Sequence, residues 1–220
     1  MIRASILSLT VILALPTAAE AKVAALTFAD GPHGQYTDPV LDILDNRNAV
    51  ATFFVIGVHA EQRPGLVVRE DKKHEVGNHS WSHPHLPELS NSEVREELDS
   101  VNDLLKDRLG TRPDASRPPY SDTNRRVEGI ANDLSMTETL WNIDSGDWKT
   151  PQPSCSHIRE NVRSKLGRER AVISLHDASP LSRNNTICAL PGIITDLRNR
   201  NYSLTTVSGL LAKGWNGDLG

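Results

Sequence analysis

The 220-residue sequence predicts an α/β fold with a parallel sheet, either open or closed into a barrel. Short apolar runs alternate along the chain with stretches in which apolar residues recur at helical spacing. Four polar residues follow directly after strand-like runs, namely Asp30, His79, Asp144 and His176. Because parallel strands present their carboxyl ends at one edge of a sheet, we expect these side chains to share one site.

The first elements follow from local signals. An apolar run predicts a strand over Val23 to Phe28, ahead of an Asp-Gly-Pro turn. A helix is then expected with Asp38 as its N-cap and Pro39 as its first residue. The buried stripe of this helix is Val40, Leu41, Ile43 and Leu44. Aromatic and β-branched residues favour a second strand over Ala51 to Ile56.

The middle of the chain is expected to hold a short strand and the longest helix. Glu75 to Asn78 reads as the strand, and the two histidines that follow it, His79 and His83, are expected on one side of a helical turn. Ser90 to Glu93 forms a capping box that opens the long helix, and Gly110 ends it. Its apolar positions are Val94, Leu98, Val101, Leu105 and Leu109.

The last third continues the alternation. Strands are expected near Thr137 to Ile143 and Ala171 to Leu175, with a helix from about Ser156 to Leu166 between them. The last helix is expected to follow Pro191, and a final short strand to lie around Tyr202 to Thr206.

The N-terminal segment resembles a secretory signal. Arg3 precedes an apolar run from Ile6 to Leu15, and Ala19-Glu20-Ala21 is a cleavage pattern. The run is too short to span a bilayer, so we expect a cleaved signal over residues 1–21, with a membrane anchor as the alternative. Residues 22–220 then form one secreted or periplasmic domain, which we expect to be a monomer. The net charge of −4 and the lack of a Lys/Arg block argue against a nucleic-acid partner.

The two cysteines are expected to pair in an oxidising compartment. Cys155 and Cys188 would close a loop of roughly thirty residues, worth on the order of 3 kcal/mol in the chain-entropy model. Two free thiols are the alternative.

One aspartate and two histidines indicate a metal site. Asp30, His79 and His83 make a three-ligand set that leaves a position open for water, as hydrolytic metal sites require. A lone His-x-x-x-His pair is more often two surface histidines, so the order of the surrounding motifs carries the metal interpretation.

Five motifs follow one another along the chain, namely Thr27–Pro32, His79–His83, Arg117–Tyr120, Asp144–Trp148 and Leu175–Asp177. Together they resemble the polysaccharide deacetylases of carbohydrate esterase family 4, the NodB-homology domain. The family includes chitin deacetylases, peptidoglycan N-acetylglucosamine deacetylases and acetylxylan esterases. The resemblance implies a distorted (β/α) barrel and removal of acetyl groups from a polysaccharide or oligosaccharide.

The resemblance also implies roles for single residues. Asp30, His79 and His83 would hold one divalent ion, most often zinc, with cobalt or nickel as substitutes. His176 would be the general acid and Asp147 the carboxylate that orients it, while Asp177 would rather cap the following segment. The substrate pocket would be formed by the backbone N–H of Tyr120 as oxyanion donor, by Pro119 beside it, and by Trp148 and Leu175 as walls for the acetyl methyl.

The sequence departs from the family at Ala29, where the pattern has the aspartate that acts as general base. Arg117 matches the arginine that pairs with that aspartate, although a plain structural ion pair is its alternative reading. A positioned base contributes about 10²–10⁴-fold, so activity should be impaired. Ala29 fits an engineered substitution or a natural member that has given up efficient hydrolysis. A non-catalytic, metal-containing carbohydrate-binding protein is therefore the alternative function.

Overall fold

The structure is a computed structural model that describes residues 22–215. The expected signal segment, residues 1–21, lies outside this range. Within the described part of the chain, no helix combines the length and apolar character needed to cross a bilayer.

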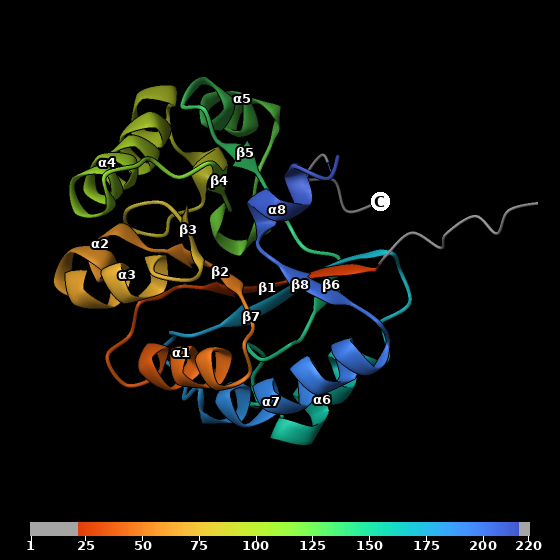
Figure 1. Ribbon diagram of the computed structural model, residues 1–220. Helices are drawn as coiled ribbons and strands as arrows, with labels where there is room; N and C mark the ends of the chain where they lie inside the picture. Colours follow the sequence, from red (N-terminus) through yellow and green to blue (C-terminus); the bar gives the residue numbers. More distant parts are fainter. Residues whose placement is uncertain (1–21, 216–220) are drawn as a thin grey trace, which may run out of the picture.

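Eight parallel strands form one curled sheet at the centre of the molecule (Figure 1). Their order is β5-β4-β3-β2-β1-β7-β6, and β8 pairs with the beginning of β1. The strands are β1 (Val23–Ala29), β2 (Ala51–Val55), β3 (Glu75–Asn78), β4 (Ala115–Ser116), β5 (Thr137–Glu138), β6 (Ile143–Asp144), β7 (Arg170–His176) and β8 (Ser203–Thr205). The predicted α/β fold, a distorted (β/α) barrel in a single domain, is confirmed: the sheet curls into an incomplete barrel.

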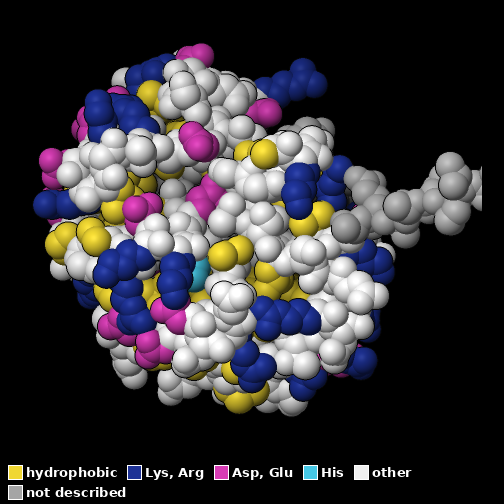
Figure 2. All heavy atoms as spheres, in the orientation of Figure 1, with side chains coloured by type: hydrophobic (Ala, Val, Ile, Leu, Met, Phe, Trp, Pro, Cys, Tyr) yellow, Lys and Arg dark blue, Asp and Glu magenta, His cyan; other side chains and the backbone are white. Residues whose placement is uncertain are grey.

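Helices cover the outside of the sheet, with α1, α6 and α7 grouped together and α4 and α5 on another side (Figure 1). The helices are α1 (Thr37–Asn46), α2 (Gly57–Gln62), α3 (Pro64–Asp71), α4 (Asn91–Leu109), α5 (Arg125–Asp133), α6 (Cys155–Arg163), α7 (Asn184–Asn199) and α8 (Val207–Leu211). The turns η1 (Leu86–Glu88) and η2 (Pro119–Ser121) are 3₁₀ helices. On the face shown in Figure 2, basic and acidic side chains are interspersed.

Alternation along the strands divides the core into two layers. In β1, Leu26 and Phe28 pack outward against the helices, whereas Ala25 and Ala29 face the interior of the curled sheet. Residues of α8 join the interior layer. The carboxyl ends of the strands lie beyond this layer, which positions their side chains over a hollow rather than within the packed core.

The capping box and the end of the longest helix are confirmed. Ser90 caps α4 through the Glu93 backbone N–H, and the Glu93 side chain accepts from the Ser90 N–H. Gly110 ends the helix in the left-handed conformation, with φ 82°.

The start of α1 differs from the prediction. The helix begins at Thr37 with Tyr36 at the N-cap position, so Asp38 lies inside the first turn. Asp38 is not a cap because its carboxylate pairs with Arg69 of α3. The Thr37 hydroxyl accepts from the His33 N–H at 2.8 Å and donates to Asp177.

The segment expected as one strand over Thr137 to Ile143 is divided between two edges of the sheet. β5 pairs with β4, whereas β6 pairs with β7. The residues between them span the open side of the curled sheet, with backbone hydrogen bonds from Thr139 to Ser116 and from Asn142 to Val172. The local sequence predicted extended backbone here, but a pattern of single residues cannot show that the chain changes strand partners.

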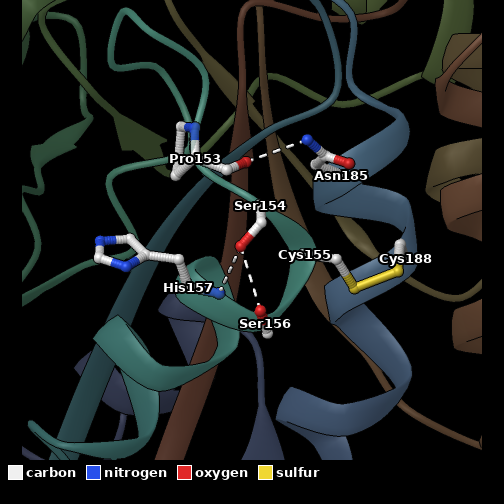
Figure 3. The surroundings of a disulfide bond; sticks show 7 residues. All are labelled: Pro153, Ser154, Cys155, Ser156, His157, Asn185 and Cys188. Atoms are coloured by element: carbon white, nitrogen blue, oxygen red, sulfur yellow. Dashed lines mark hydrogen bonds between the residues drawn. A yellow bond between two sulfur atoms is a disulfide. The ribbon is translucent and has the colours of Figure 1, made fainter.

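The helix expected after Pro191 begins seven residues earlier, at Asn184, so α7 contains Pro191 in its interior. Another short helix, α8, follows it. Tertiary packing overrides the helix-breaking tendency of proline here, because the residues before it are buried against α6. The predicted disulfide contributes to this packing, since Cys155 at the start of α6 is bonded to Cys188 of α7 (Figure 3).

Candidate active site

A cavity of about 330 Å³ lies at the carboxyl ends of the central strands. It is lined by Ala29, Asp30, His79, His83, Arg117, Pro118, Tyr120, Ser121, Trp141, Trp148, Ser174 and His176. Three of the four strand-end residues expected to share a site therefore do so. The fourth, Asp144, does not line the cavity. Its carboxylate instead accepts hydrogen bonds from the Trp148 indole at 3.2 Å and from the Gly146 N–H at 2.7 Å.

Asp30, His79 and His83 converge on one point. One donor atom from each lies within 4.8 Å of the others. The Nε2 atoms of His79 and His83 lie 3.4 and 3.3 Å from the same Oδ1 of Asp30. The Nδ1–H of His79 donates to the Arg117 carbonyl at 2.7 Å, which directs the Nε2 lone pair toward Asp30. A neutral imidazole facing a carboxylate is the arrangement that a divalent transition metal requires, so these residues fit a metal ion.

The electrostatics agree with this fit. Burial alone would raise the pKa of Asp30, but its hydrogen bonds with His79 and His83 outweigh that effect and hold the pKa well below its ordinary value. Burial lowers the pKa of His79, which favours the neutral imidazole. The set therefore presents an ionised carboxylate and a neutral His79 ligand at neutral pH.

The loop that carries the histidines is not the helical turn that their spacing suggested. Ser80 and His83 have φ values of 63° and 66°, which are left-handed. Side chains take the hydrogen bonds that a helix would have used, because Asn78 Oδ1 accepts from the Ser80 N–H and Ser80 Oγ accepts from the His83 N–H. The two imidazoles still converge, since the compact loop brings both back over Asp30.

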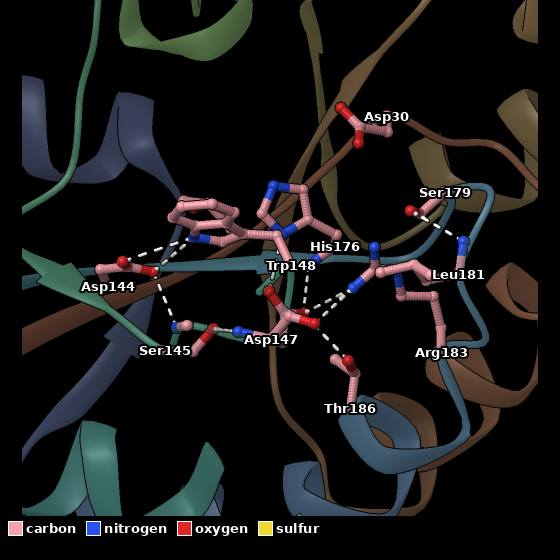
Figure 4. A network of polar contacts seen from close by, with 12 residues as sticks. Asp30, Asp144, Ser145, Asp147, Trp148, His176, Ser179, Leu181, Arg183 and Thr186 are labelled. Atoms are coloured by element: carbon pink, nitrogen blue, oxygen red, sulfur yellow. Dashed lines mark hydrogen bonds and ion pairs between the residues drawn. The ribbon is translucent and has the colours of Figure 1, made fainter. Parts of the chain in front are cut away.

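His176 and Asp147 form a tight pair (Figure 4). The His176 Nδ1 lies 2.7 Å from Asp147 Oδ1, and the His176 backbone N–H donates to Asp147 Oδ2 at 2.9 Å. Thr186 Oγ1 donates to the same oxygen at 2.9 Å, and Arg183 Nη1 lies 3.9 Å away. Asp147 is fully buried, so these partners leave its carboxylate in one orientation.

The charges of this pair favour a protonated histidine. Burial would lower the pKa of His176, but the Asp147 carboxylate outweighs it and the pKa is raised. Burial would likewise raise the pKa of Asp147, but the charge of His176 and its hydrogen bonds outweigh burial, so the pKa is lowered. Asp177, which follows His176, neither orients it nor caps the following segment as expected: one carboxylate oxygen accepts from Thr37, and the other has no hydrogen-bond partner among residues 22–215.

Arg117 is buried at the wall of the cavity and has no carboxylate partner among residues 22–215. It donates to Thr27 Oγ1 at 2.7 Å and to two backbone carbonyls, those of Thr139 and Leu140. Burial lowers its pKa to about 9, and its guanidinium lies 4.2 Å from the Phe54 ring centroid. The interpretation of Arg117 as a structural ion pair is therefore wrong for the described chain.

The cavity walls differ in part from the expectation. Trp148 lines the cavity with half of its surface exposed, and Tyr120 is 60% exposed at the rim. Leu175 does not line it. Since side chains alternate along β7, Leu175 packs into the outer core, whereas Ser174 and His176 face the cavity.

Pro119 is also absent from the lining, and its neighbour Pro118 takes that place. Trp141 is a wall residue that the sequence analysis missed. Counting back by two from His176 would have found Ser174, but no local signal marks Trp141, which lies in the segment between β5 and β6.

Comparisons with known proteins agree with the site. The family model described as polysaccharide deacetylase matches residues 17–139, more than half of the chain. The peptidoglycan-N-acetylglucosamine deacetylase PgdA of Listeria monocytogenes is 34% identical over 197 residues, which cover 89% of this chain and 40% of PgdA. The chain thus spans about two fifths of the length of this curated relative.

Solved structures show the same fold. The structure of the peptidoglycan deacetylase PdaC from Bacillus subtilis has 35% identity and a TM-score of 0.77, and covers 87% of this chain and 91% of that one. BA3943 of Bacillus anthracis, a pseudoenzyme of carbohydrate esterase family 4, has 27% identity and a TM-score of 0.78, and covers 87% of this chain and 66% of that one. A mutant of BA3943 has restored enzymatic activity. With its family motifs gathered around one cavity, this chain belongs to the polysaccharide deacetylases of carbohydrate esterase family 4.

Proposed function

We propose that the chain is a metal-dependent deacetylase scaffold for N-acetylglucosamine polymers, either chitin and its oligosaccharides or peptidoglycan, and that Ala29 impairs its activity. The observation that carries this proposal is the convergence of Asp30, His79 and His83 in one cavity with the His176–Asp147 pair. The relatives named peptidoglycan deacetylases support the substrate class.

Asp30, His79 and His83 would hold the ion, with zinc favoured by one carboxylate and two imidazoles. A divalent ion at this site would act as a Lewis acid toward water and toward the acetyl carbonyl. The remaining chemistry belongs to side chains of the chain itself. The backbone N–H of Tyr120 would stabilise the oxyanion, and Trp148 would bound the acetyl methyl.

His176 is the proposed general acid. Its Nδ1 faces Asp147, so its second ring nitrogen is the one available to the leaving group. A raised pKa keeps that nitrogen protonated at neutral pH, and the proton would pass to the departing amine nitrogen as the carbon–nitrogen bond breaks.

What the site lacks is a carboxylate to remove a proton from the attacking water. Ala29 lines the cavity together with Arg117, and its methyl group cannot accept a proton. Within the part of the chain that the structure describes, Arg117 has only neutral acceptors. The existence of a pseudoenzyme relative whose mutant has restored activity supports this interpretation.

The test is to replace Ala29 with aspartate. Deacetylation of acetylated chitooligosaccharides, peptidoglycan and acetylxylan should rise by about 10²–10⁴-fold, mainly in kcat, with metal present. Ala29→Asn is the matched control, because it adds similar volume without a base. Adding His176→Ala to Ala29→Asp should remove the gain, since acid and base serve one reaction.

Two outcomes would point to other functions. A gain confined to acetylxylan would identify an acetylxylan esterase. If Ala29→Asp leaves amide and ester hydrolysis unchanged while the chain binds acetylated oligosaccharides, a non-catalytic carbohydrate-binding role replaces the proposal. The exposed rings of Trp148 and Tyr120 at the rim favour this second candidate.

We also propose that residues 1–21 are a cleaved signal and that residues 22–220 act as an exported monomer without a membrane anchor. The apolar segment of the signal is the support. The intact mass of exported protein and its size by light scattering test both points, and retention of Ile6 to Leu15 in the mature protein would contradict them.

A further inference from the structure

A carboxylate from α4 binds the loop between the two histidines of the candidate metal site. Glu97 Oε2 accepts hydrogen bonds from the backbone N–H groups of Trp81 and Ser82, both at 2.8 Å. Its Oε1 accepts from Ser82 Oγ at 2.6 Å. One partly buried carboxylate thus receives three hydrogen bonds from two consecutive loop residues.

The opposite edge of the same loop is bound by α2. The carbonyls of Ser80 and Trp81 accept from the Gly57 and Val58 N–H groups, both at 3.0 Å. A side chain at Gly57 would collide with the Trp81 ring. Glu97 therefore supplies the acceptors and α2 the donors for a loop that has no helical hydrogen bonds of its own.

This support matters because the loop is conformationally costly. Its residues Ser80 and His83 are left-handed without being glycine, a conformation that persists only when the surroundings impose it. His83 follows Ser82 directly, so the hydrogen bonds to Glu97 act one residue away from the imidazole that meets Asp30.

We propose that Glu97 is a positioning residue for the metal site, which holds the loop so that His83 faces Asp30. The inference rests on the proposed metal-dependent function. Glu97 would thus hold the ligands in place before the ion binds, although it lies fourteen positions after His83, on the helix α4. Removal of Glu97 should weaken metal binding about 10–100-fold, the range seen when supports of metal ligands are lost.

The experiment measures Zn²⁺ affinity by competition with a chromophoric chelator, in the full chain. Glu97→Ala should lose about 10–100-fold, and Glu97→Gln should lose less, because an amide oxygen still accepts from the two N–H groups. Glu96→Gln is the matched control, since Glu96 is exposed beside Glu97 in a groove that Trp81 and Ser82 also line, and it accepts no hydrogen bond from described residues. It should bind Zn²⁺ as the unmodified chain does.

Two further measurements separate positioning from loss of fold. The absorption spectrum of Co²⁺-loaded protein should change in Glu97→Ala, whereas unfolding of the chelated proteins should remain cooperative. If Glu97→Ala fails to fold, Zn²⁺ affinity is measured in Glu97→Gln and Ser82→Ala instead. Unchanged Zn²⁺ affinity in these variants overturns the role of Glu97 alone. Failure of the unmodified chain to bind Zn²⁺ overturns the metal site, and this inference with it.

Discussion

Two buried carboxyl groups behind the active site predict an unusual dependence of stability on pH. Glu70 of α3 is fully buried and neither of its oxygens has a hydrogen-bond partner among residues 22–215. Asp177 is also buried, with one oxygen bonded to Thr37 and the other unpartnered. Burial raises the pKa of Asp177 to about 7, and burial together with the charge of Asp177 raises the pKa of Glu70 well above its ordinary value.

The direction in which stability changes with pH depends on how many protons the folded and unfolded states bind. In the unfolded chain Glu70 is ionised above about pH 4.3, whereas the folded protein retains its proton. The folded state therefore binds more protons, and the free energy of unfolding falls as pH rises toward the folded pKa. While the folded protein retains this one proton, the free energy of unfolding falls by ~1.4 kcal/mol per pH unit.

Replacing Glu70 with glutamine should remove this contribution. Above pH 5.5, we expect the free energy of unfolding to fall less steeply with pH in Glu70→Gln than in the unmodified chain, by up to ~1.4 kcal/mol per pH unit. Urea unfolding followed by tryptophan fluorescence measures it, with a chelator present because metal binding is itself pH-dependent. Histidine titrations are common to both proteins and cancel in the difference.

The control is Asp71→Asn, which changes an exposed carboxylate one position along the chain. Its pH dependence should follow that of the unmodified protein. Parallel stability curves for Glu70→Gln and the unmodified chain would refute the reasoning, because they would mean that Glu70 is ionised in the folded state or reaches water.

Three further predictions concern the site and its support. Protein purified without chelator should contain about one divalent ion per chain, and His79→Ala should lose it; equal metal contents by elemental analysis would reject the ligand assignment. Replacing Cys155 and Cys188 with serine should lower the free energy of unfolding by ~3 kcal/mol, and unreduced peptide mapping of exported protein should find them joined rather than alkylated. In the variant with a restored base, Asp147→Asn should move the alkaline limb of the rate profile to lower pH, because the carboxylate is what raises the pKa of His176; an unmoved limb would contradict this pairing.

Elements with strong local signals could be predicted from the sequence. The capping box of α4, its terminal Gly110 and the strand β3 agree closely with the structure, because a few neighbouring residues determine each. The convergence of Asp30, His79 and His83 could also be predicted, since their motifs follow strand ends that a parallel sheet brings together.

Features that depend on distant contacts could not be predicted in this way. The helix around Pro191 exists because α7 packs on α6, and the histidine loop keeps its shape through side chains such as Glu97. Leu175 was wrongly expected in the pocket wall. Its motif indicates that this part of β7 lies near the site, but the alternation of side chains along the strand places Leu175 in the outer core. Buried carboxylic acids such as Glu70 carry no sequence signal, because an isolated glutamate is normally exposed.

Ala29 and Arg117 are best understood together. A guanidinium that is 1% exposed has been taken out of water, and such a charge is ordinarily compensated by a carboxylate. Here the compensation is partial, with a hydroxyl, two carbonyls and two aromatic rings around it. An aspartate at position 29 would enter the same cavity and complete the pair, and the cation would in turn keep that carboxylate ionised. Under the proposed function, Ala29 leaves the site without its base while the surroundings that would support one remain, which is why introducing an aspartate there is the decisive test.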